Sequence, residues 1–434
     1  MTTGLLIAAP SSGSGKTVIT LALLRALRRA GHAVSSLKIG PDYIDPGFHT
    51  LASGRPCLNI DGWAMRPTTR AGQLDQIMED VEFVVAEGVM GLFDGAADGT
   101  GSSADLAVEL DFPVILIVDV SGQSASAAAV INGFKDFRDD IDVVGVIFNR
   151  VGSPRHQQML HRAMAAIPVP VLGYVPRNDA LKLDSRHLGL VQAEEVVDIE
   201  NQIDAAASFI ENHIDVGALT SLGNPLRTST GTSTTPIPPL GQRVAVASDA
   251  AFSFCYPHVL KGWQEAGATI SIFSPLADQT PPNDCDAIYL PGGYPELHAE
   301  QISSNGNFMS GLRHSADQGA TLYGECGGYM VLGTSLTDRD SNTHPMAGLL
   351  PIETSFATPK LHLGYRKLQL KADGPLGKSG TVYRGHEFHY STQRMTSDEF
   401  LFAARDALDE DLGSFGCQNG TVLGSYIHLI DSMG

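Results

Sequence analysis

The chain has 434 residues, 43% of them hydrophobic, and a formal net charge of −19. This length is enough for two domains of roughly 200 residues, each with its own core. The acidic excess argues against a nucleic-acid partner and against an anionic membrane surface, because both bind positive charge. No apolar run is long enough to cross a bilayer, and the N-terminus lacks the charged start of a signal peptide, so we expect a soluble cytoplasmic protein.

The cysteines do not form a pattern. They number five, an odd count, and contain no Cys-x-x-Cys pair; they are Cys57, Cys255, Cys285, Cys326 and Cys417. Neither a disulfide framework nor a zinc site is therefore predicted. Four of them are interpreted as small apolar residues, and Cys326 is the exception.

Short β-branched strands alternate with helical segments such as 16–29, and this alternation is typical of a parallel, doubly wound sheet. The expected strands of the first half are 5–9, 83–86, 114–118 and 143–148. A second series follows at 243–247, 269–273, 287–290 and 320–323. Between them, 221–242 is rich in Ser, Thr, Gly and Pro, which predicts a linker between domains 1–220 and 243–434.

The first expected strand runs into Ala9-Pro-Ser-Ser-Gly-Ser-Gly-Lys-Thr17, a phosphate loop that opens the helix from Lys16. Backbone N–H groups of Gly13, Ser14 and Gly15 can hold phosphates, Lys16 can reach the outer phosphates, and Thr17 can bind Mg²⁺. Pro10 stands where the common motif has its first glycine, so the loop is a variant. This pattern predicts an ATP site.

Four carboxylates follow strand ends at the same predicted rim: Asp42, Asp45, Glu87 and Asp94. Glu87 ends an apolar strand, where a carboxylate can hold a metal beside the phosphates. Because carboxylates repel one another, we expect a metal or cationic substrate groups to offset their charge. A solvated acidic loop remains an alternative for any one of them.

Asn149 closes the strand 143–148, where a side chain can hydrogen-bond the edge of adenine. Asparagine is also common in turns for local reasons, so both interpretations stay open.

The second half contains a Gly-x-Cys-x-Gly turn at Gly324–Gly328, after an expected strand. This is the thiol form of the strand-to-helix elbow that exposes a nucleophile, and the helix N-terminus is expected to lower the pKa of Cys326. His428, just past a short strand, is the candidate base. Gly292 and Gly293, after another strand, can turn N–H groups toward an oxyanion.

The segment Tyr383–Ser391 contains two histidines, an arginine and a glutamate. His386 and His389 do not have the spacing of two that would put both on one strand face, so no zinc site is predicted. Arg384 and His386 are interpreted as contacts to an acidic substrate or to the interface between the domains. The alternative is that they belong to a plain surface strand.

Together these motifs resemble the cobyrinic or hydrogenobyrinic acid a,c-diamide synthases, a family of glutamine-dependent corrinoid amidases. The resemblance extends nearly end to end, through segments 9–17, 38–47, 87–95, 148–151, 291–296, 324–333 and 384–391 and His428. It implies an N-terminal domain similar to the dethiobiotin-synthetase-type ATPases and a C-terminal class I glutamine amidotransferase domain.

One position departs from the common class I pattern. Many glutaminases place a glutamate two residues after the histidine, where this chain has Ile430. The corrinoid amidases resemble the chain in this respect. His428 therefore works with Cys326 as a dyad or is oriented by another group such as a backbone carbonyl; Asp431 is near in sequence but in the wrong register.

The resemblance implies a reaction with two centres. Cys326 releases ammonia from glutamine with the help of His428, while Gly292, Gly293 and Gly327 bind the substrate and its oxyanion. ATP, held with Mg²⁺ on Thr17, Asp45 and Glu87, phosphorylates an acetate carboxylate of the macrocycle. Ammonia, shielded from bulk water, then attacks at the a and c positions, on an acceptor side lined by Asp42, Tyr43, Ile44, Asp45 and Asp94.

Three other readings remain open. A nucleotide-switch protein of the chromosome-partitioning kind shares the phosphate loop but needs neither Cys326 nor a second domain. A regulatory protein with an inactive glutaminase fold would lack Cys326 or His428. Within the enzymes, the acceptor could be another tetrapyrrole, such as nickel sirohydrochlorin, or another cobyrinate position. No sequence pattern marks an interface, although homodimers are common in enzymes of this size.

Overall fold

The computed structural model describes residues 1–178, 181, 192–227 and 235–433. The chain forms two compact units. The first comprises Met1–Trp63 and Arg70–Thr232, and the second comprises Ala64–Thr69 and Ser233–Gly434.

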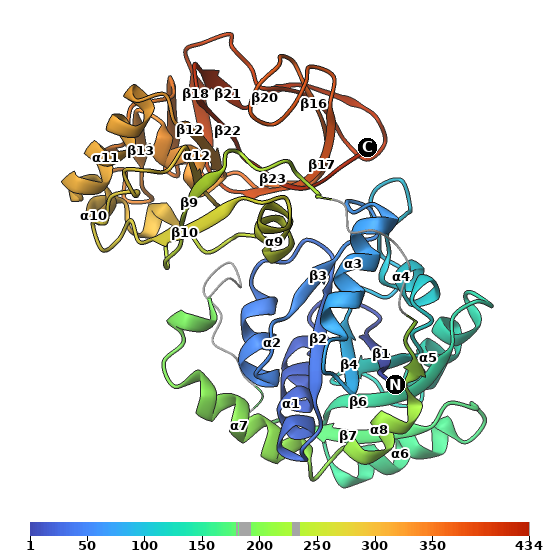
Figure 1. Cartoon of the computed structure of the whole chain (residues 1–434). Helices are drawn as coiled ribbons and strands as arrows, with labels where there is room; N and C mark the ends of the chain where they lie inside the picture. The colour runs from blue at the N-terminus through green and yellow to red at the C-terminus, as the bar shows by residue number, and fades with distance from the viewer. Residues whose placement is uncertain (179–180, 182–191, 228–234, 434) are drawn as a thin grey trace. The chain divides into compact units, whose positions relative to one another are not determined.

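The first unit is built on an eight-stranded sheet in the order β3-β2-β4-β1-β5-β6-β7, with β8 paired to β1 (Figure 1). All pairs are parallel except β1 with β8. The strands are β1 (Thr3–Ala8), β2 (Val34–Ile39), β3 (Leu58–Ile60), β4 (Phe83–Glu87), β5 (Val114–Asp119), β6 (Val143–Val151), β7 (Val171–Pro176) and β8 (Asn224–Pro225). The strand order reverses at β1, and ligands bind beyond the carboxyl ends of strands at such a point.

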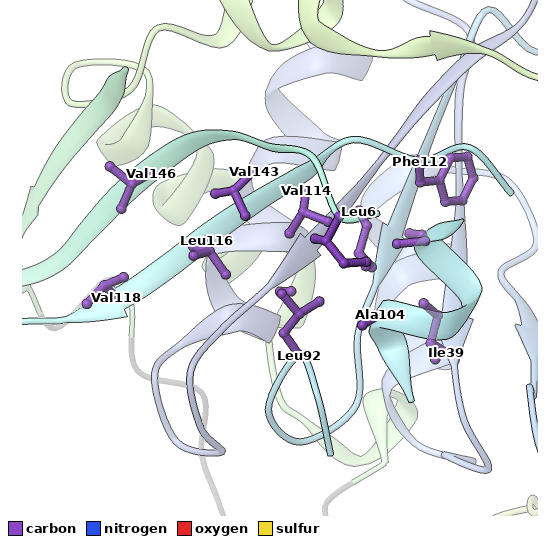
Figure 2. Close-up of a cluster of buried hydrophobic side chains, with 14 of the residues drawn as sticks. Leu6, Ile39, Leu92, Ala104, Phe112, Val114, Leu116, Val118, Val143 and Val146 are labelled. Atoms are coloured by element: carbon purple, nitrogen blue, oxygen red, sulfur yellow. The ribbon is translucent and has the colours of Figure 1, made fainter. Parts of the chain in front are cut away.

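Helices cover both faces of this sheet. Those with known bounds are α1 (Lys16–Arg29), α2 (Asp45–Ser53), α3 (Pro67–Ile77), α4 (Ser103–Glu109), α5 (Ser126–Asp136), α6 (Pro154–Met164), the 3₁₀ helix η2 (Ala193–Glu195), α7 (Ile199–Ile210) and α8 (Val216–Leu222). Helices α1, α2, α7 and α8 pack on one face and α3 to α6 on the other, each with its own apolar cluster. Figure 2 shows the cluster on the face covered by α3 to α6, in which Leu6, Leu116 and Val146 of three strands face Leu92 and Ala104. The unit is therefore a doubly wound α/β layer structure.

The second unit has a six-stranded sheet in the order β10-β9-β11-β12-β22-β21, parallel except for β21. Its strands are β9 (Arg243–Ala247), β10 (Thr269–Phe273), β11 (Ala287–Leu290), β12 (Thr321–Glu325), β21 (Cys417–Asn419) and β22 (Val422–Ser425). The helices are α9 (Pro257–Glu265), the 3₁₀ helix η3 (Pro295–Leu297), α10 (Ala299–Ser304), α11 (Gly306–Asp317) and α12 (Gly327–Leu332). Helices α10, α11 and α12 share one apolar cluster with this sheet.

Two further sheets complete the second unit, and the sequence analysis did not predict them. A mixed sheet in the order β14-β13-β15-β18 contains β13 (Ser335–Thr337), β14 (Thr343–Pro345), β15 (Ile352–Ser355) and β18 (Thr392–Met395). An antiparallel sheet in the order β20-β19-β16-β17-β23 contains β16 (His362–Leu370), β17 (Val382–His389), β19 (Phe402–Arg405), β20 (Asp411–Phe415) and β23 (Ile427–Ser432).

The predicted strands of both halves and the helix 16–29 are confirmed, with ends that differ by at most three residues. Parts of the predicted linker 221–242 are structured. Residues 224–225 form β8, and the carbonyl of Ile237 accepts a hydrogen bond of 3.1 Å from the indole of Trp263; residues 228–234 of that linker lie outside the described part. Among the described residues, no helix combines the length and apolarity that a membrane span requires.

Candidate active sites

The phosphate loop lies between β1 and α1, at the carboxyl edge of the first sheet. Gly15 has a φ of 89°, and a Cβ there would lie 2.3 Å from Nδ2 of Asn149, so the loop needs glycine for both conformation and space. The Lys16 ammonium donates to the carbonyl of Met90 at 2.5 Å. Burial lowers the pKa of Lys16, although Glu87 and Asp45 act to raise it.

A buried ion cluster lies beside this loop and centres on Lys38 of β2. The Lys38 ammonium binds the carboxylates of Asp45 and Glu87, the latter at 2.9 Å. The carboxylate of Asp42 lies 3.6 Å from the same ammonium. Thr17 Oγ1 donates to Glu87 at 2.6 Å and also lies 3.2 Å from Asp45. Lys38 therefore offsets part of this negative charge from within the chain, and the expectation that a metal or cationic substrate groups offset the rest stays a prediction.

The charges in this cluster shift one another's pKa values. Burial acts to raise the pKa of Glu87, but Lys38 and His49 outweigh burial and hold it well below its usual range. Burial and the neighbouring Asp42 raise the pKa of Asp45 to about 6 despite Lys38. His49, whose Nε2 lies 2.7 Å from Glu87, completes the cluster. Glu87 is thus held as an anion beside the phosphate loop.

The other residues predicted for the acceptor side lie around this cluster. Asp42 accepts backbone hydrogen bonds from Ile44 and Asp45 at 2.9 and 3.1 Å, which fixes the turn before α2. Tyr43 and Ile44 are half-buried in the same turn. Asp94 accepts from the N–H of Gly91 at 2.8 Å and so closes its own loop.

Asn149 lies beside the phosphate loop, two residues before the end of β6. Its side-chain amide donates to the carbonyl of Ser14 at 2.8 Å and is buried. It also lines a pocket of about 620 Å³ whose wall is formed by Gly15, Val18, Ile19, Ser121, Asn149, Arg150, Pro176, Arg177, Asn178 and Leu181. A pocket of this size beside a phosphate loop is large enough for a nucleoside.

The thiol elbow occupies the junction of β12 and α12 in the second unit. Cys326 has φ 46° and ψ −102°, a sparsely populated conformation that marks a strained turn. Its backbone N–H donates to the carbonyl of Ser425 on β22 at 2.8 Å. Burial raises the pKa of the Cys326 thiol well above its usual range, although the N–H of Gly327 acts to lower it. The N-terminus of α12 thus acts in the expected direction through Gly327, but burial outweighs it, so the thiol needs a base.

His428 on β23 is the nearby base candidate, and it is fully buried. Burial and the neighbouring His386 and His389 lower the pKa of His428 to about 3, so the imidazole is neutral near pH 7, and the same shift weakens it as a base. A Cβ on Gly292 would lie 2.2 Å from Cε1 of His428, so the ring packs directly on the loop after β11.

That loop also approaches the elbow. A Cβ on Gly327 would lie 3.0 Å from the backbone nitrogen of Gly293. The carbonyl of Gly292 accepts from the N–H of Phe254 at 2.9 Å, which holds the loop in place. The loop of Gly292 and Gly293 thus packs against the ring of His428 on one side and approaches the elbow that carries Cys326 on the other.

Sequence reasoning missed Lys38 and His49 in the first unit. The sequence feature that could have identified Lys38 is a single positively charged residue within the strand Val34–Ile39, in which all six residues are buried. Its partner Glu87 lies opposite on β4, and only this strand pairing brings the two together.

A second group of titratable residues lies on the antiparallel sheet. Ligand atoms of His362, Glu387 and His389 lie within 4.8 Å of one another. Arg366 binds the Glu387 carboxylate at 2.6 Å, and Nδ1 of His389 lies 3.1 Å from the carbonyl of Ser391. The carboxylate is therefore already balanced by a guanidinium.

Comparison with known proteins assigns both halves of the chain. The CobQ/CobB/MinD/ParA nucleotide-binding domain family matches residues 5–191, and the CobB/CobQ-like glutamine amidotransferase domain family matches residues 243–432. Hydrogenobyrinate a,c-diamide synthase of Brucella anthropi is 51% identical over 434 residues, which cover 99% of both chains. The chain belongs to the hydrogenobyrinate a,c-diamide synthase family.

Other members of this family are equally similar. The proteins of the same name from Brucella abortus and Rhizobium meliloti are 52% and 51% identical, again over 99% of each chain. The chain is accordingly an ATP-using enzyme of the synthase type with a glutamine amidotransferase domain. In this family context, the phosphate loop belongs to the nucleotide-binding domain and Cys326 to the amidotransferase domain.

Proposed function

We propose that the protein uses ATP and glutamine to convert the a and c acetate carboxylates of hydrogenobyrinic acid to amides, a step of cobalamin biosynthesis. The observation that carries this proposal is the similarity along the whole chain to synthases of that name, with which about half of the aligned residues are identical. The phosphate loop and the thiol centre, present in one chain, supply the two activities that the reaction needs.

The first unit activates the carboxylate. N–H groups of Gly13, Ser14 and Gly15 hold the phosphates of ATP, and Lys16 balances their charge. The acceptor carboxylate attacks the γ-phosphorus, ADP leaves, and an acyl phosphate forms. The pocket beside Asn149 receives the nucleoside. The turn with Asp42, Tyr43 and Ile44 and the loop of Asp94 form the acceptor side.

Thr17, Asp45 and Glu87 fit a magnesium ion, because their oxygens converge within hydrogen-bond distance of Thr17 Oγ1 and oxygen is the ligand Mg²⁺ prefers. The ion would neutralise charge on the transferred phosphoryl group. Lys38 favours the ionised forms of Asp45 and Glu87 and holds both carboxylates in position for this role.

The second unit supplies ammonia. His428 takes the proton of Cys326, and the thiolate attacks the side-chain amide carbon of glutamine. N–H groups of Gly293 and Gly327 stabilise the oxyanion. His428 returns the proton to the leaving ammonia, and water then hydrolyses the thioester to glutamate. Ammonia displaces phosphate from the acyl phosphate, which yields the amide, and the cycle repeats at the second carboxylate.

Replacing the thiol tests whether the two centres are separable. With ATP and Mg²⁺, Cys326→Ser should lose glutamine-dependent amidation but retain amidation with ammonium, while Lys16→Ala should lose both. Mass spectrometry of the product from hydrogenobyrinic acid, with cobyrinic acid in a parallel reaction, identifies the acceptor. Glutamine hydrolysis with neither acid modified would refute the proposed substrate, and loss of ammonium-dependent amidation in Cys326→Ser would refute the separation.

A further inference from the structure

His428 lacks a carboxylate at the usual position, since Ile430 stands two residues after it. The nearest acid along the chain, Asp431, is fully engaged elsewhere. Its carboxylate accepts from Nη2 of Arg66 at 2.7 Å and from Oγ1 of Thr69 at 2.6 Å. Asp431 is therefore not the group that orients His428.

Another carboxylate approaches His428 from the nucleophile's own strand. Glu325 is the last residue of β12 and directly precedes Cys326. Its Oε2 lies 3.9 Å from Nδ1 of His428, and both side chains are buried. Its Oε1 accepts from the backbone N–H of Leu429, the residue after the histidine, at 3.1 Å. One carboxylate thus holds the backbone next to the imidazole through a hydrogen bond and lies 3.9 Å from the imidazole nitrogen, just beyond hydrogen-bond distance.

Two tyrosines fix this carboxylate. The hydroxyl of Tyr289 donates to Oε2 at 2.7 Å, and that of Tyr323 donates to Oε1 at 3.0 Å. These neighbouring rings on β11 and β12 are stacked at 5.9 Å, so Glu325 has little freedom to turn away. A carboxylate held in this way has a defined direction toward Nδ1.

We propose that Glu325 is the positioning residue of the glutaminase centre, where its carboxylate orients His428 and balances the positive charge that the imidazole gains from the Cys326 proton. It takes over the role of the carboxylate that is absent at Ile430. Nε2 is then the atom that accepts the proton of the thiol, and Nδ1 faces Glu325. This inference rests on the glutaminase half of the proposed function.

The surrounding charges make the effect depend on pH. Glu325 faces Tyr289 and Tyr323 together with the thiols of Cys255 and Cys326. His428 lies 3.9 Å from Glu325 and faces His386 and His389 of β17, which oppose its protonation, while a hydrogen bond with the backbone of Phe254 favours it. Burial raises the pKa of Glu325 to about 7, although its hydrogen bonds act to lower it.

The direction of the pH dependence of glutamine hydrolysis follows from the pKa of Glu325. Above about pH 7 the carboxylate is ionised and can stabilise the imidazolium, and below it this support is lost. Glutamine hydrolysis should therefore rise with pH through about 7.

The variant Glu325→Gln separates charge from shape, because an amide keeps the size and can still accept from Leu429. We expect kcat for glutamine hydrolysis to fall by about 10²-fold with little change in KM, since Glu325 acts through His428. Alkylation of Cys326 by iodoacetamide should slow and lose its rise near pH 7. Amidation with ammonium should keep its wild-type rate because it bypasses this centre, and the retained KM for glutamine shows that the second unit is folded.

Tyr323→Phe is the matched variant, because it removes one hydrogen bond and leaves the carboxylate. Without that donor the pKa of Glu325 should rise further, so the pH–rate curve should shift to higher pH. This variant also carries the test if Glu325→Gln does not fold.

The inference is overturned if Glu325→Gln keeps the wild-type kcat and pH profile, or if the curve of Tyr323→Phe does not move. Failure of the proposed function itself has a different signature. In that case the wild-type protein would release no glutamate from glutamine, so no decrease in glutamine hydrolysis could be measured in the variants.

Discussion

The backbone of Cys326 combines a nucleophile with a conformation that β-carbons disfavour. At φ 46° and ψ −102°, any residue except glycine is strained, at a cost on the order of 1–3 kcal/mol. Such strain is common where a turn must expose a reactive atom. The chain therefore keeps a destabilising residue at this position because the thiol is required there.

This strain predicts an unusual order of stability. Cys326→Gly should be more stable to urea than Cys326→Ala by about 1 kcal/mol, because alanine retains the strained Cβ and glycine does not. Neither variant can hydrolyse glutamine. If Cys326→Ala proves at least as stable as Cys326→Gly in urea unfolding, the elbow is not strained as described.

Sequence reasoning at the scale of single residues succeeded where the partners are close in the chain. Lys16 and Thr17 follow from the spacing of one loop, and Cys326 follows from the glycines around it. Lys38, His49 and Glu325 were missed because each is defined by a partner on another strand or helix. Lys38 lies opposite Glu87 only because β2 pairs with β4 in that register, and no local pattern encodes that pairing.

Among the elements, the loop after β11 has the tightest requirement for space. Gly292 lies against the ring of His428, and a Cβ would approach Cε1 to 2.2 Å, well inside van der Waals contact. The ring is buried and packed, so it cannot move away without disturbing its position toward the thiol.

Gly292→Ala should therefore abolish most glutamine hydrolysis, by about 10²-fold or more, while amidation with ammonium continues. Gly306→Ala is the matched control, because no atom lies within 4 Å of a Cβ at that position and its φ is not positive. Steady-state rates with glutamine and with ammonium measure both effects. Equal rates for the two alanine variants with glutamine would contradict the packing argument.

The elements themselves were predictable to different degrees. Central strands such as β4 and β5 are continuous apolar runs, buried on both faces, and their sequence shows it. Strands β16 and β20 expose many of their residues, and β20 is exposed at four of its five positions. Their weak alternation hid the antiparallel sheet that contains both strands from the sequence analysis.

At the scale of the whole molecule, the two activities occupy separate cores. One unit contains both apolar clusters that flank the nucleotide-binding sheet, and the other contains the cluster behind the thiol elbow. All the groups assigned to ATP belong to the first unit. A nucleotide that binds only the folded state should thus stabilise that unit directly.

Amide hydrogen exchange read by mass spectrometry can follow each unit in the intact chain. A non-hydrolysable ATP analogue with Mg²⁺, at about 100 times its Kd, should stabilise the first unit by about 2.7 kcal/mol, and protection should increase in β1, α1 and β4. Lys16→Ala should abolish the increase because the phosphates lose their cation, whereas Cys326→Ser should retain it. An unchanged increase in Lys16→Ala would mean that the analogue binds elsewhere than the phosphate loop.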